Sequence, residues 1–345
     1  MGMAGPAMRA VGVQPVLRTE DLSVMGFTEV LGHLPRIMRM LDTIRTALSH
    51  ERPDAVVLID APDFHFRVAR IAHSLGIPVL YYISPKLWAW REGRVCFIRK
   101  YVQRLISILP FEVDFYARHG MHIDYVGHPL LDAVRTPEIL STPPHARRIG
   151  IVPGSRAREV SALMPIFART ATLLQARIPD LEFVLPVAPG LDVDHVRALW
   201  TAEVPLQLVA SQDRYPVMRS CRAILAASGT ATLETALLEV PTAVAYTFSR
   251  FSFWLGTKLV KIPYISLPNL ILDHPVFPEF LQHHAQPWAL AAAVEQWIFD
   301  TQARADVLAR LAALPDILGG GGAVQRAAAI VCAELVRHNT PQHSA

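Results

Sequence analysis

The chain has 345 residues, of which 52% are hydrophobic, and a formal net charge of +3. This length fits two domains of ordinary size, and the small charge, with no basic module interleaved with aromatic residues, argues against nucleic-acid binding. Neither an uncharged apolar run of about 18 residues nor a basic-then-apolar N-terminal signal is found, so the sequence predicts a cytoplasmic protein without a membrane span.

The cysteines and the basic residues narrow the classes of partner. Cys96, Cys221 and Cys332 are far apart, which predicts ordinary thiols rather than a disulfide framework or a metal site. Lysine occurs at only four positions, so the positive charge is carried almost entirely by arginine. Because arginine binds phosphates in a bidentate manner, an anionic small molecule or an anionic membrane face remains open as a partner.

Apolar runs alternate with helix-like stretches along the first part of the chain, which is typical of a parallel sheet covered by helices. Buried strands are predicted at residues 55–59, 79–83 and 105–109, and helices at residues 64–75, 92–100 and 112–118. The proline-containing stretch at residues 136–144 is the predicted linker.

A second series of strands follows the linker. Its members are predicted at residues 148–152, 182–185, 206–209, 223–225 and 242–246, and a terminal helix is predicted at residues 323–337. We therefore expect an α/β fold of two Rossmann-like domains, residues 1–140 and 141–318, with a C-terminal helix and tail at 319–345. Ligands of open parallel sheets bind beyond the carboxyl ends of the strands, so two such domains that face each other predict a cleft.

The strand at residues 223–225 leads into a small polar turn, Ser228-Gly229-Thr230, which opens a helix that carries Glu234. Backbone N–H groups at the positive end of a helix bind phosphate or diphosphate, and a carboxylate further along that helix can accept hydrogen bonds from a ribose. The turn therefore predicts half of a nucleotide site. An ordinary strand-to-helix turn with Ser228 as N-cap is the alternative.

A second loop, Pro153-Gly154-Ser155-Arg156, follows the strand at residues 148–152. Gly154 allows a tight backbone turn, and Arg156 is placed where a guanidinium can reach a phosphate across a cleft. A solvated ion pair with a neighbour is the alternative for Arg156 and is the preferred interpretation for Arg158. The two loops support each other as parts of one site.

Polar and aromatic residues follow the strands of the first series. Asp60 can accept a proton from a sugar hydroxyl, whereas Asp63 sits where a helix N-cap belongs. From the residues alone, catalysis and a structural role stay equally open for Asp60. Trp88 and Trp90 follow the next strand and either stack on a sugar or an acyl chain or anchor the loop in the interior.

Two further segments carry weaker signals. Asn269, in the polar break Ser266-Leu267-Pro268-Asn269-Leu270, is predicted to line the cleft. Residues 24–41 combine apolar residues with arginines, a pattern that suits an anionic membrane surface and also suits a helix packed on a sheet. Pro35 argues against a single straight helix there. Glu279, His283 and His284 lack the spacing of a ligand set, so no metal is predicted.

Taken in order, these motifs resemble lipid-A-disaccharide synthases, which are inverting glycosyltransferases of the GT-B fold. The resemblance covers most of the chain. The matching stretches are Ser23-Val24-Met25-Gly26, residues 59–64, Tyr82-Ile83-Ser84-Pro85, Trp88-Ala89-Trp90-Arg91, Leu109-Pro110-Phe111-Glu112, Val126-Gly127-His128-Pro129, Pro153-Gly154-Ser155-Arg156, residues 227–234, Ser266-Leu267-Pro268-Asn269-Leu270 and Pro278-Glu279-Phe280-Leu281-Gln282.

The resemblance implies a reaction that joins UDP-2,3-diacylglucosamine to 2,3-diacylglucosamine 1-phosphate, with release of UDP and formation of a β-1,6-linked disaccharide. It implies no metal or other cofactor, a location on the cytoplasmic face of the inner membrane as a peripheral protein, and leaves a homodimer open. Inversion requires a base near the acceptor hydroxyl and positive charge near the departing diphosphate. The roles implied are base for Asp60, diphosphate binding for Arg156, Ser228, Gly229 and Thr230, ribose binding for Glu234, and lining of the donor site for Asn269.

One part of the family pattern is not matched. The family begins with a strand, a glycine-containing loop and a helix, whereas Gly2-Met3-Ala4-Gly5-Pro6 resembles the loop after the family's second strand. The first domain is therefore expected to lack its first strand and loop, and weak or absent activity is expected. A nucleotide-sugar-binding protein without turnover, and another UDP-sugar enzyme of this architecture such as an epimerase, are the alternatives.

Overall fold

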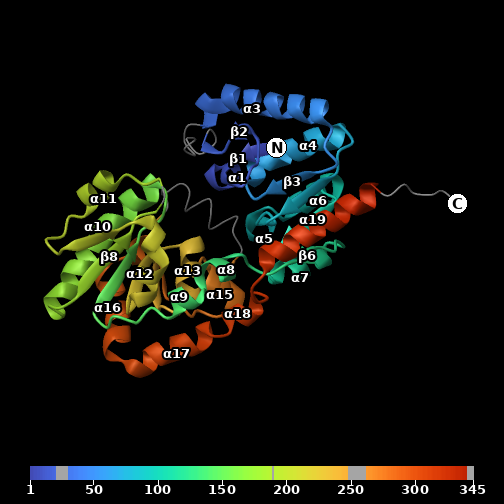
Figure 1. Ribbon diagram of the computed structural model, residues 1–345. Helices are drawn as coiled ribbons and strands as arrows, with labels where there is room; N and C mark the ends of the chain where they lie inside the picture. The colour runs from blue at the N-terminus through green and yellow to red at the C-terminus, as the bar shows by residue number, and fades with distance from the viewer. Residues whose placement is uncertain (21–29, 189, 248–261, 340–345) are drawn as a thin grey trace. The chain divides into compact units, whose positions relative to one another are not determined.

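The computed structural model describes residues 1–20, 30–188, 190–247 and 262–339. These residues form two compact units. Figure 1 shows the chain coloured from blue at the N-terminus to red at the C-terminus. Unit 1 comprises residues 1–107 and 112–126 with the C-terminal residues from Val324, and unit 2 comprises residues 108–111 and 127–323. Each unit has its own parallel sheet and its own apolar core, which is the α/β organisation that the sequence predicts.

The main sheet of unit 1 has four parallel strands in the order β3-β4-β5-β6. Three of them confirm the predicted strands of the first series, and large side chains such as Tyr81, Tyr116 and Ile98 are fully buried in the core beside the sheet. Its elements are β3 (Val56–Ile59), α4 (Pro62–Ser74), β4 (Val79–Tyr82), α5 (Leu87–Trp90), η1 (Glu92–Arg94), α6 (Val95–Tyr101), β5 (Arg104–Ser107), α7 (Phe111–Arg118) and β6 (Asp124–Tyr125).

The N-terminal part of unit 1 adds a separate pair of parallel strands, β1 (Gly2–Ala4) and β2 (Pro15–Arg18), joined by α1 (Pro6–Ala10). Residues 2–4, which resemble a loop in the sequence, thus form a strand. Helix α3 (Val30–Glu51) continues through Pro35, so the proline does not end the helix. Pro35 lies near the start of α3, where the loss of one i−4 hydrogen bond leaves most of the helix intact. Residues 24–29 lie outside the described part.

Unit 2 contains a parallel sheet of six strands in the order β12-β11-β10-β7-β8-β9. The five predicted strands of the second series are all present, and β12 is an additional edge strand. Counted within the unit, this is the order 3-2-1-4-5-6 of a dinucleotide-binding fold, and the order reverses between β7 and β10. The strands are β7 (Arg148–Val152), β8 (Glu182–Pro186), β9 (Leu206–Val209), β10 (Ala223–Ala227), β11 (Thr242–Tyr246) and β12 (Glu279–Leu281).

Helices surround this sheet. Residues of α10 and α16, including Phe167 and Trp297, share one core with the strands, and every residue of β10 is buried, which is typical of a parallel strand covered on both faces. The helices are α8 (Leu130–Val134), α9 (Pro137–Leu140), α10 (Ala157–Arg177), α11 (Val193–Leu199), η2 (Ser211–Asp213), α12 (Arg214–Ser220), α13 (Thr230–Leu237), α15 (Leu267–Leu272), η3 (Gln282–His284), α16 (Pro287–Phe299), α17 (Thr301–Leu311) and α18 (Leu314–Ile317).

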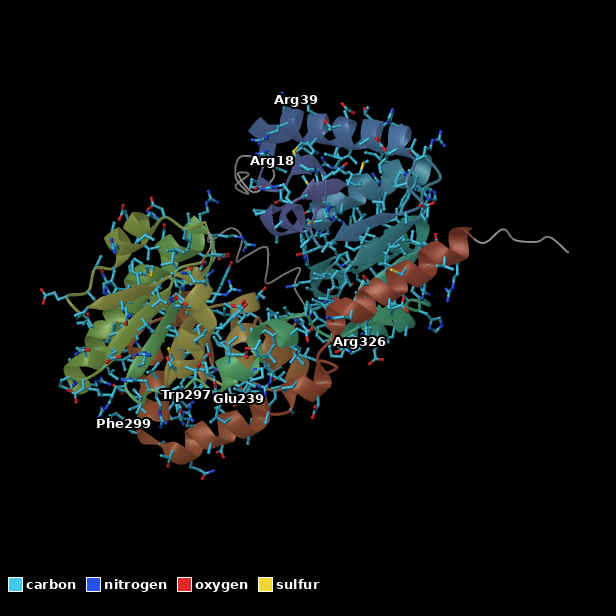
Figure 2. The ribbon with its side chains drawn as sticks, viewed as in Figure 1. Arg18, Arg39, Glu239, Trp297, Phe299 and Arg326 are labelled. Atoms are coloured by element: carbon cyan, nitrogen blue, oxygen red, sulfur yellow. The ribbon has the colours of Figure 1, made fainter. Side chains whose placement is uncertain are left out.

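The two units do not divide the chain where the sequence-based ranges do. Helices α8 and α9 contact α13 and α12 of unit 2, and Arg135 after α8 donates at 3.0 Å to the carboxylate of Glu239, which is labelled in Figure 2. The last helix, α19 (Ala323–Asn339), lies mostly in unit 1. There Arg326 donates to the carbonyl oxygen of Val126 at 2.9 Å, and Gln103 donates to the buried carboxylate of Glu334 at 2.7 Å.

Within the described ranges, no helix is both long enough and apolar enough to cross a membrane.

Candidate active site

The loops that follow β7 and β10 lie at the point where the strand order of unit 2 reverses. The two strands pair directly in the sheet, with Ile151 opposite Leu225. A Cβ placed on Gly154, in the first loop, would lie 3.5 Å from the Cβ of Ala227, which ends β10. The structure therefore brings the two predicted loops together. This position is where open α/β sheets bind their ligands.

The first loop turns at Gly154, whose φ of 106° lies in the region that favours glycine. Arg156 is the N-cap residue of α10, and its largely exposed guanidinium donates to Oε1 of Glu159 at 2.7 Å. The hydroxyl of Tyr246, at the end of β11, donates to the same oxygen at 3.2 Å. Arg156 is thus in an ion pair with a neighbour, the alternative weighed from the sequence, and its exposed side chain remains free to reach a ligand.

The second loop begins its helix at a residue other than Ser228. Gly229, not Ser228, is the N-cap residue of α13, with φ 150° and ψ −160°, a conformation essentially restricted to glycine. The hydroxyl of Ser228 donates to the carbonyl oxygen of Ile265 at 2.8 Å, so it ties the turn to the segment before α15. The alternative from the sequence, in which Ser228 caps the helix, is therefore wrong in its cap residue. The helix still begins at Thr230, and its first amides have no i−4 carbonyl within the helix.

Glu234 extends from α13 towards the first residues of α12. Its mostly buried carboxylate accepts a hydrogen bond from the hydroxyl of Tyr215 at 3.0 Å and lies 3.5 Å from Nη2 of Arg214. The Arg214 guanidinium also stacks on the Tyr215 ring, at 4.3 Å from the ring centroid. Sequence reasoning missed Arg214 and Tyr215 because they lie far from Glu234 in the chain. Their position directly after a strand and η2 was the available signal.

Asn269 links α15 to the segment that leads into β12. It is fully buried in α15, and its amide donates to Phe277 O at 2.8 Å and accepts from Phe277 N at 2.9 Å. The amide also donates to Glu279, whose carboxylate accepts hydrogen bonds from the backbone of Ile265 and Ser266 as well. Asn269 therefore fixes the segment that receives the Ser228 hydroxyl, and its polar atoms are engaged within the protein.

In unit 1, Asp60 follows β3 with a strained backbone. Asp60 has φ 53° and Ala61 has φ 45°, a conformation that costs non-glycine residues energy and is concentrated at functional sites. The carbonyl oxygen of Asp60 holds this turn, because it accepts hydrogen bonds from the Tyr81 hydroxyl at 2.6 Å and from Nδ1 of His65 at 2.7 Å. Burial lowers the pKa of His65 and so favours the neutral form of its ring.

The side chain of Asp60 is exposed, and no hydrogen bond to its carboxylate occurs among the described residues. Asp63 behaves differently. Ala61 is the N-cap residue of α4, so the prediction of Asp63 as N-cap is wrong, and Asp63 instead pairs with Arg91 at 3.0 Å and Arg94 at 3.3 Å. With Ala61 in the N-cap position, α4 begins at Pro62, and Asp63 already lies within the first turn of the helix. Of the two carboxylates after β3, only that of Asp60 is free to accept a proton.

A buried acid lies beside the next two strands. Glu112 accepts hydrogen bonds from Nε1 of Trp88 at 3.0 Å and from the hydroxyl of Ser107. Burial raises the pKa of Glu112 to about 7, although these hydrogen bonds and the charge of Lys86 favour the ionised form. Trp88 is thus a loop anchor, as one reading of the sequence has it, whereas Trp90 is 47% exposed.

The described residues include no group of three or more His, Cys, Asp or Glu side chains that could hold a metal ion. The arrangement offers an exposed carboxylate on a strained turn in unit 1. In unit 2 it offers a glycine turn, a helix N-terminus, an arginine and a carboxylate around one pair of strands. These groups suit proton abstraction and the binding of a nucleoside diphosphate, respectively.

Solved structures with the same fold have very different sequences. The chain matches the S. aureus MnaA–UDP co-structure with a TM-score of 0.64 at 12% identity, covering 94% of this chain and 84% of that one. It matches the calicheamicin glycosyltransferase CalG4 with a TM-score of 0.60 at 19% identity, covering 97% and 89%. At these identities the matches show the fold, which is GT-B-like with two parallel sheets.

Sequence comparison is more specific. The model of the family described as lipid-A-disaccharide synthetase matches residues 1–311. A lipid-A-disaccharide synthase of Geobacter sulfurreducens is 39% identical over 338 residues, which cover 96% of this chain and 88% of that protein. The corresponding protein of Nitrosococcus oceani is 37% identical and covers 93% and 84%. The chain therefore belongs to the lipid-A-disaccharide synthase family and is a glycosyltransferase of lipid A biosynthesis.

Proposed function

We propose that unit 2 binds the UDP-sugar donor and that Asp60 of unit 1 is the general base that deprotonates the acceptor hydroxyl. The substrates would be UDP-2,3-diacylglucosamine and 2,3-diacylglucosamine 1-phosphate, as the resemblance implies. The observation that carries the donor site is the pairing of the loops after β7 and β10 at the reversal of strand order, where Gly154 lies against Ala227.

Each donor-site group has a stated task in this proposal. The first amides of α13 and the guanidinium of Arg156 bind the diphosphate, because both present N–H donors with positive charge. The carboxylate of Glu234 accepts hydrogen bonds from the ribose and exchanges its present contact with the Tyr215 hydroxyl for them. Positive charge from the arginine and the helix end compensates the charge that develops on the departing diphosphate.

Titration calorimetry with UDP tests the donor site. We expect Arg156→Ala and Glu234→Ala each to weaken UDP binding by about tenfold or more, because each loses a charge-assisted hydrogen bond. Arg177→Ala is the matched control, since Arg177 pairs with Glu295 near the end of α10, 21 residues after Arg156. The donor site is misplaced if both site variants bind UDP as tightly as the parent.

We further propose that the chain associates through α3 with the anionic surface of the inner membrane. The acylated substrates reside in that membrane. On this helix Met38 is 51% exposed and Arg39 is exposed on the outer side (Figure 2), while Ile37 packs against the core of unit 1. An apolar side chain beside a cationic one on an exposed helix face is typical of interfacial association.

Vesicle flotation with phosphatidylglycerol-containing liposomes tests this association. We expect the double variant Met38→Ser, Arg39→Gln to reduce the bound fraction several-fold, because it removes one exposed apolar group that would enter the membrane interface and one attractive charge. The exposed Arg118 of α7 supplies the control variant Arg118→Gln, which alters charge alone at another place in unit 1. Equal flotation of all three proteins excludes this face of α3.

A further inference from the structure

Two arginines of the segment after β4 converge on one carboxylate in unit 1. Nη1 of Arg91 lies 3.0 Å and Nη1 of Arg94 lies 3.3 Å from the same oxygen, Oδ1 of Asp63. The side chains of Arg91 and Arg94 are 30% and 40% exposed, so both guanidiniums face solvent in part. A ligand can therefore approach them without rearrangement of the core.

Aromatic rings hold both guanidiniums in place. The Arg91 guanidinium stacks on the ring of Trp90 at 3.6 Å from the centroid, and that of Arg94 lies over the ring of Phe66 at 5.6 Å. Such contacts are favourable and fix the plane of the guanidinium, so less rotamer entropy is lost when an anion binds. The pair is preorganised even though it is partly exposed.

Charge and hydrogen-bonding capacity are left over at this cluster. Two guanidiniums face a single carboxylate, which leaves an excess of one positive charge. Each guanidinium has five N–H donors, and in the described residues each uses only Nη1 for a hydrogen bond to a side chain. A phosphate group, with several acceptor oxygens and negative charge, matches what remains.

The cluster lies beside Asp60. Asp63 is three residues after Asp60, so their Cα atoms are at most about 11 Å apart. The charges of both carboxylates act on one hydroxyl, that of Tyr81, and each raises its pKa in addition to the effect of burial. The base and the two arginines therefore occupy one neighbourhood at the carboxyl ends of β3 and β4.

We propose that Arg91 and Arg94 form the subsite for the phosphate of the acceptor. This inference rests on the proposed function, in which Asp60 acts on the acceptor hydroxyl. The acceptor carries its reacting 6-hydroxyl and its 1-phosphate on one sugar ring, on the two sides of the ring oxygen, and unit 1 holds the proposed base and the two arginines in one neighbourhood. On binding, the phosphate takes over donors that Asp63 and solvent share in the free protein.

The experiment compares two acceptors, diacylglucosamine 1-phosphate and the same sugar without the phosphate. We expect the double variant Arg91→Gln, Arg94→Gln to lower kcat/KM for the phosphorylated acceptor by about 100-fold, since two charge-assisted contacts are lost. Turnover of the acceptor without phosphate and the affinity for UDP should stay within about threefold of the parent. Arg118→Gln is the control on the same unit and should leave kcat/KM unchanged for both acceptors.

A different outcome is expected if Arg91 and Arg94 have a purely structural role and only join α4 to the segment after β4. In that case both acceptors lose activity by the same factor, and the proposal is overturned; unchanged activity with both overturns it too. Should the double variant not fold, as judged by circular dichroism, Arg94→Lys alone decides, because it keeps charge but loses the planar fork. Selective loss with the phosphorylated acceptor supports the subsite, and equal loss or none refutes it.

Inorganic phosphate gives an independent measurement. In the parent it should inhibit competitively against the phosphorylated acceptor, and the arginine variants should require at least about tenfold more phosphate for the same inhibition. Asp60→Asn separates this inference from the proposed base. If Asp60→Asn stays fully active while the arginine variants lose selectivity for the phosphate, the base is wrong and the subsite stands. The reverse result retains the base and removes the subsite.

Discussion

Asp60→Asn should lower kcat by 10²–10⁴-fold, within the range that a general base contributes. The amide has the shape of the carboxylate but cannot accept the acceptor proton. Asparagine also tolerates the left-handed conformation well, so the φ of 53° at residue 60 should survive the change. Because the carbonyl of residue 60, not its side chain, accepts the bonds from Tyr81 and His65, the turn keeps its anchors.

Turnover and UDP binding must be measured on the same preparations. We expect the UDP dissociation constant of Asp60→Asn to equal that of the parent, because the groups that we propose for donor binding belong to unit 2. Asp54→Asn is the matched control: Asp54 is exposed and precedes β3, at the other end of the same strand. Unchanged turnover in Asp60→Asn, or an equal loss in Asp54→Asn, would count against Asp60 as the base.

Glu112→Gln should change how the stability of unit 1 depends on pH. The pKa of Glu112 is about 7 in the folded protein, against 4.5 for an ordinary glutamate. Between these values the folded state binds more protons than the unfolded state, so the free energy of unfolding falls as the pH rises from about 4.5 to about 7. The raised pKa corresponds to a loss of about 3 kcal/mol over this window.

Glutamine keeps an acceptor oxygen for Trp88, and its amide N–H can donate to the Ser107 hydroxyl in place of the second carboxylate oxygen. It carries no charge at any pH. We therefore expect the stability of Glu112→Gln relative to the parent to rise by about 3 kcal/mol between pH 4.5 and pH 8. Urea unfolding at a series of pH values measures this, with hydrogen exchange to report on unit 1. Asp114→Asn, an exposed acid on the same helix, is the control. Parallel stability profiles for Glu112→Gln and the parent would contradict the assignment.

The sequence predicted most of the local structure. Each strand of the two series lies within a residue or two of its predicted range, because short β-branched and apolar runs bounded by helix-like stretches indicate buried parallel strands. The motif order also indicated the family correctly. Both depend on information that is local in the chain or fixed by its order.

The identity of the helix N-cap residues and the hydrogen-bond partners of polar side chains could not be predicted from neighbouring residues in the chain. Ser228 and Asp63 are good N-cap residues by type, yet Gly229 and Ala61 take that position because their backbones adopt positive φ. The Ser228 hydroxyl instead contacts Ile265, and the Asp63 carboxylate contacts Arg91. Both partners are distant in sequence. A propensity scale gives no information on such partners.

What the sequence alone determined was the α/β class and the family, and its short motifs also named the two candidate donor loops and the candidate base, which stay predictions. Only the tertiary structure decided that β7 and β10 are neighbours, that Asn269 is engaged with Phe277 and Glu279, and that Arg91 and Arg94 meet at Asp63. The physical reason is that strand order and side-chain contacts arise from packing between segments far apart in the chain. The apolar pattern of each segment fixes its type but leaves its neighbours undetermined.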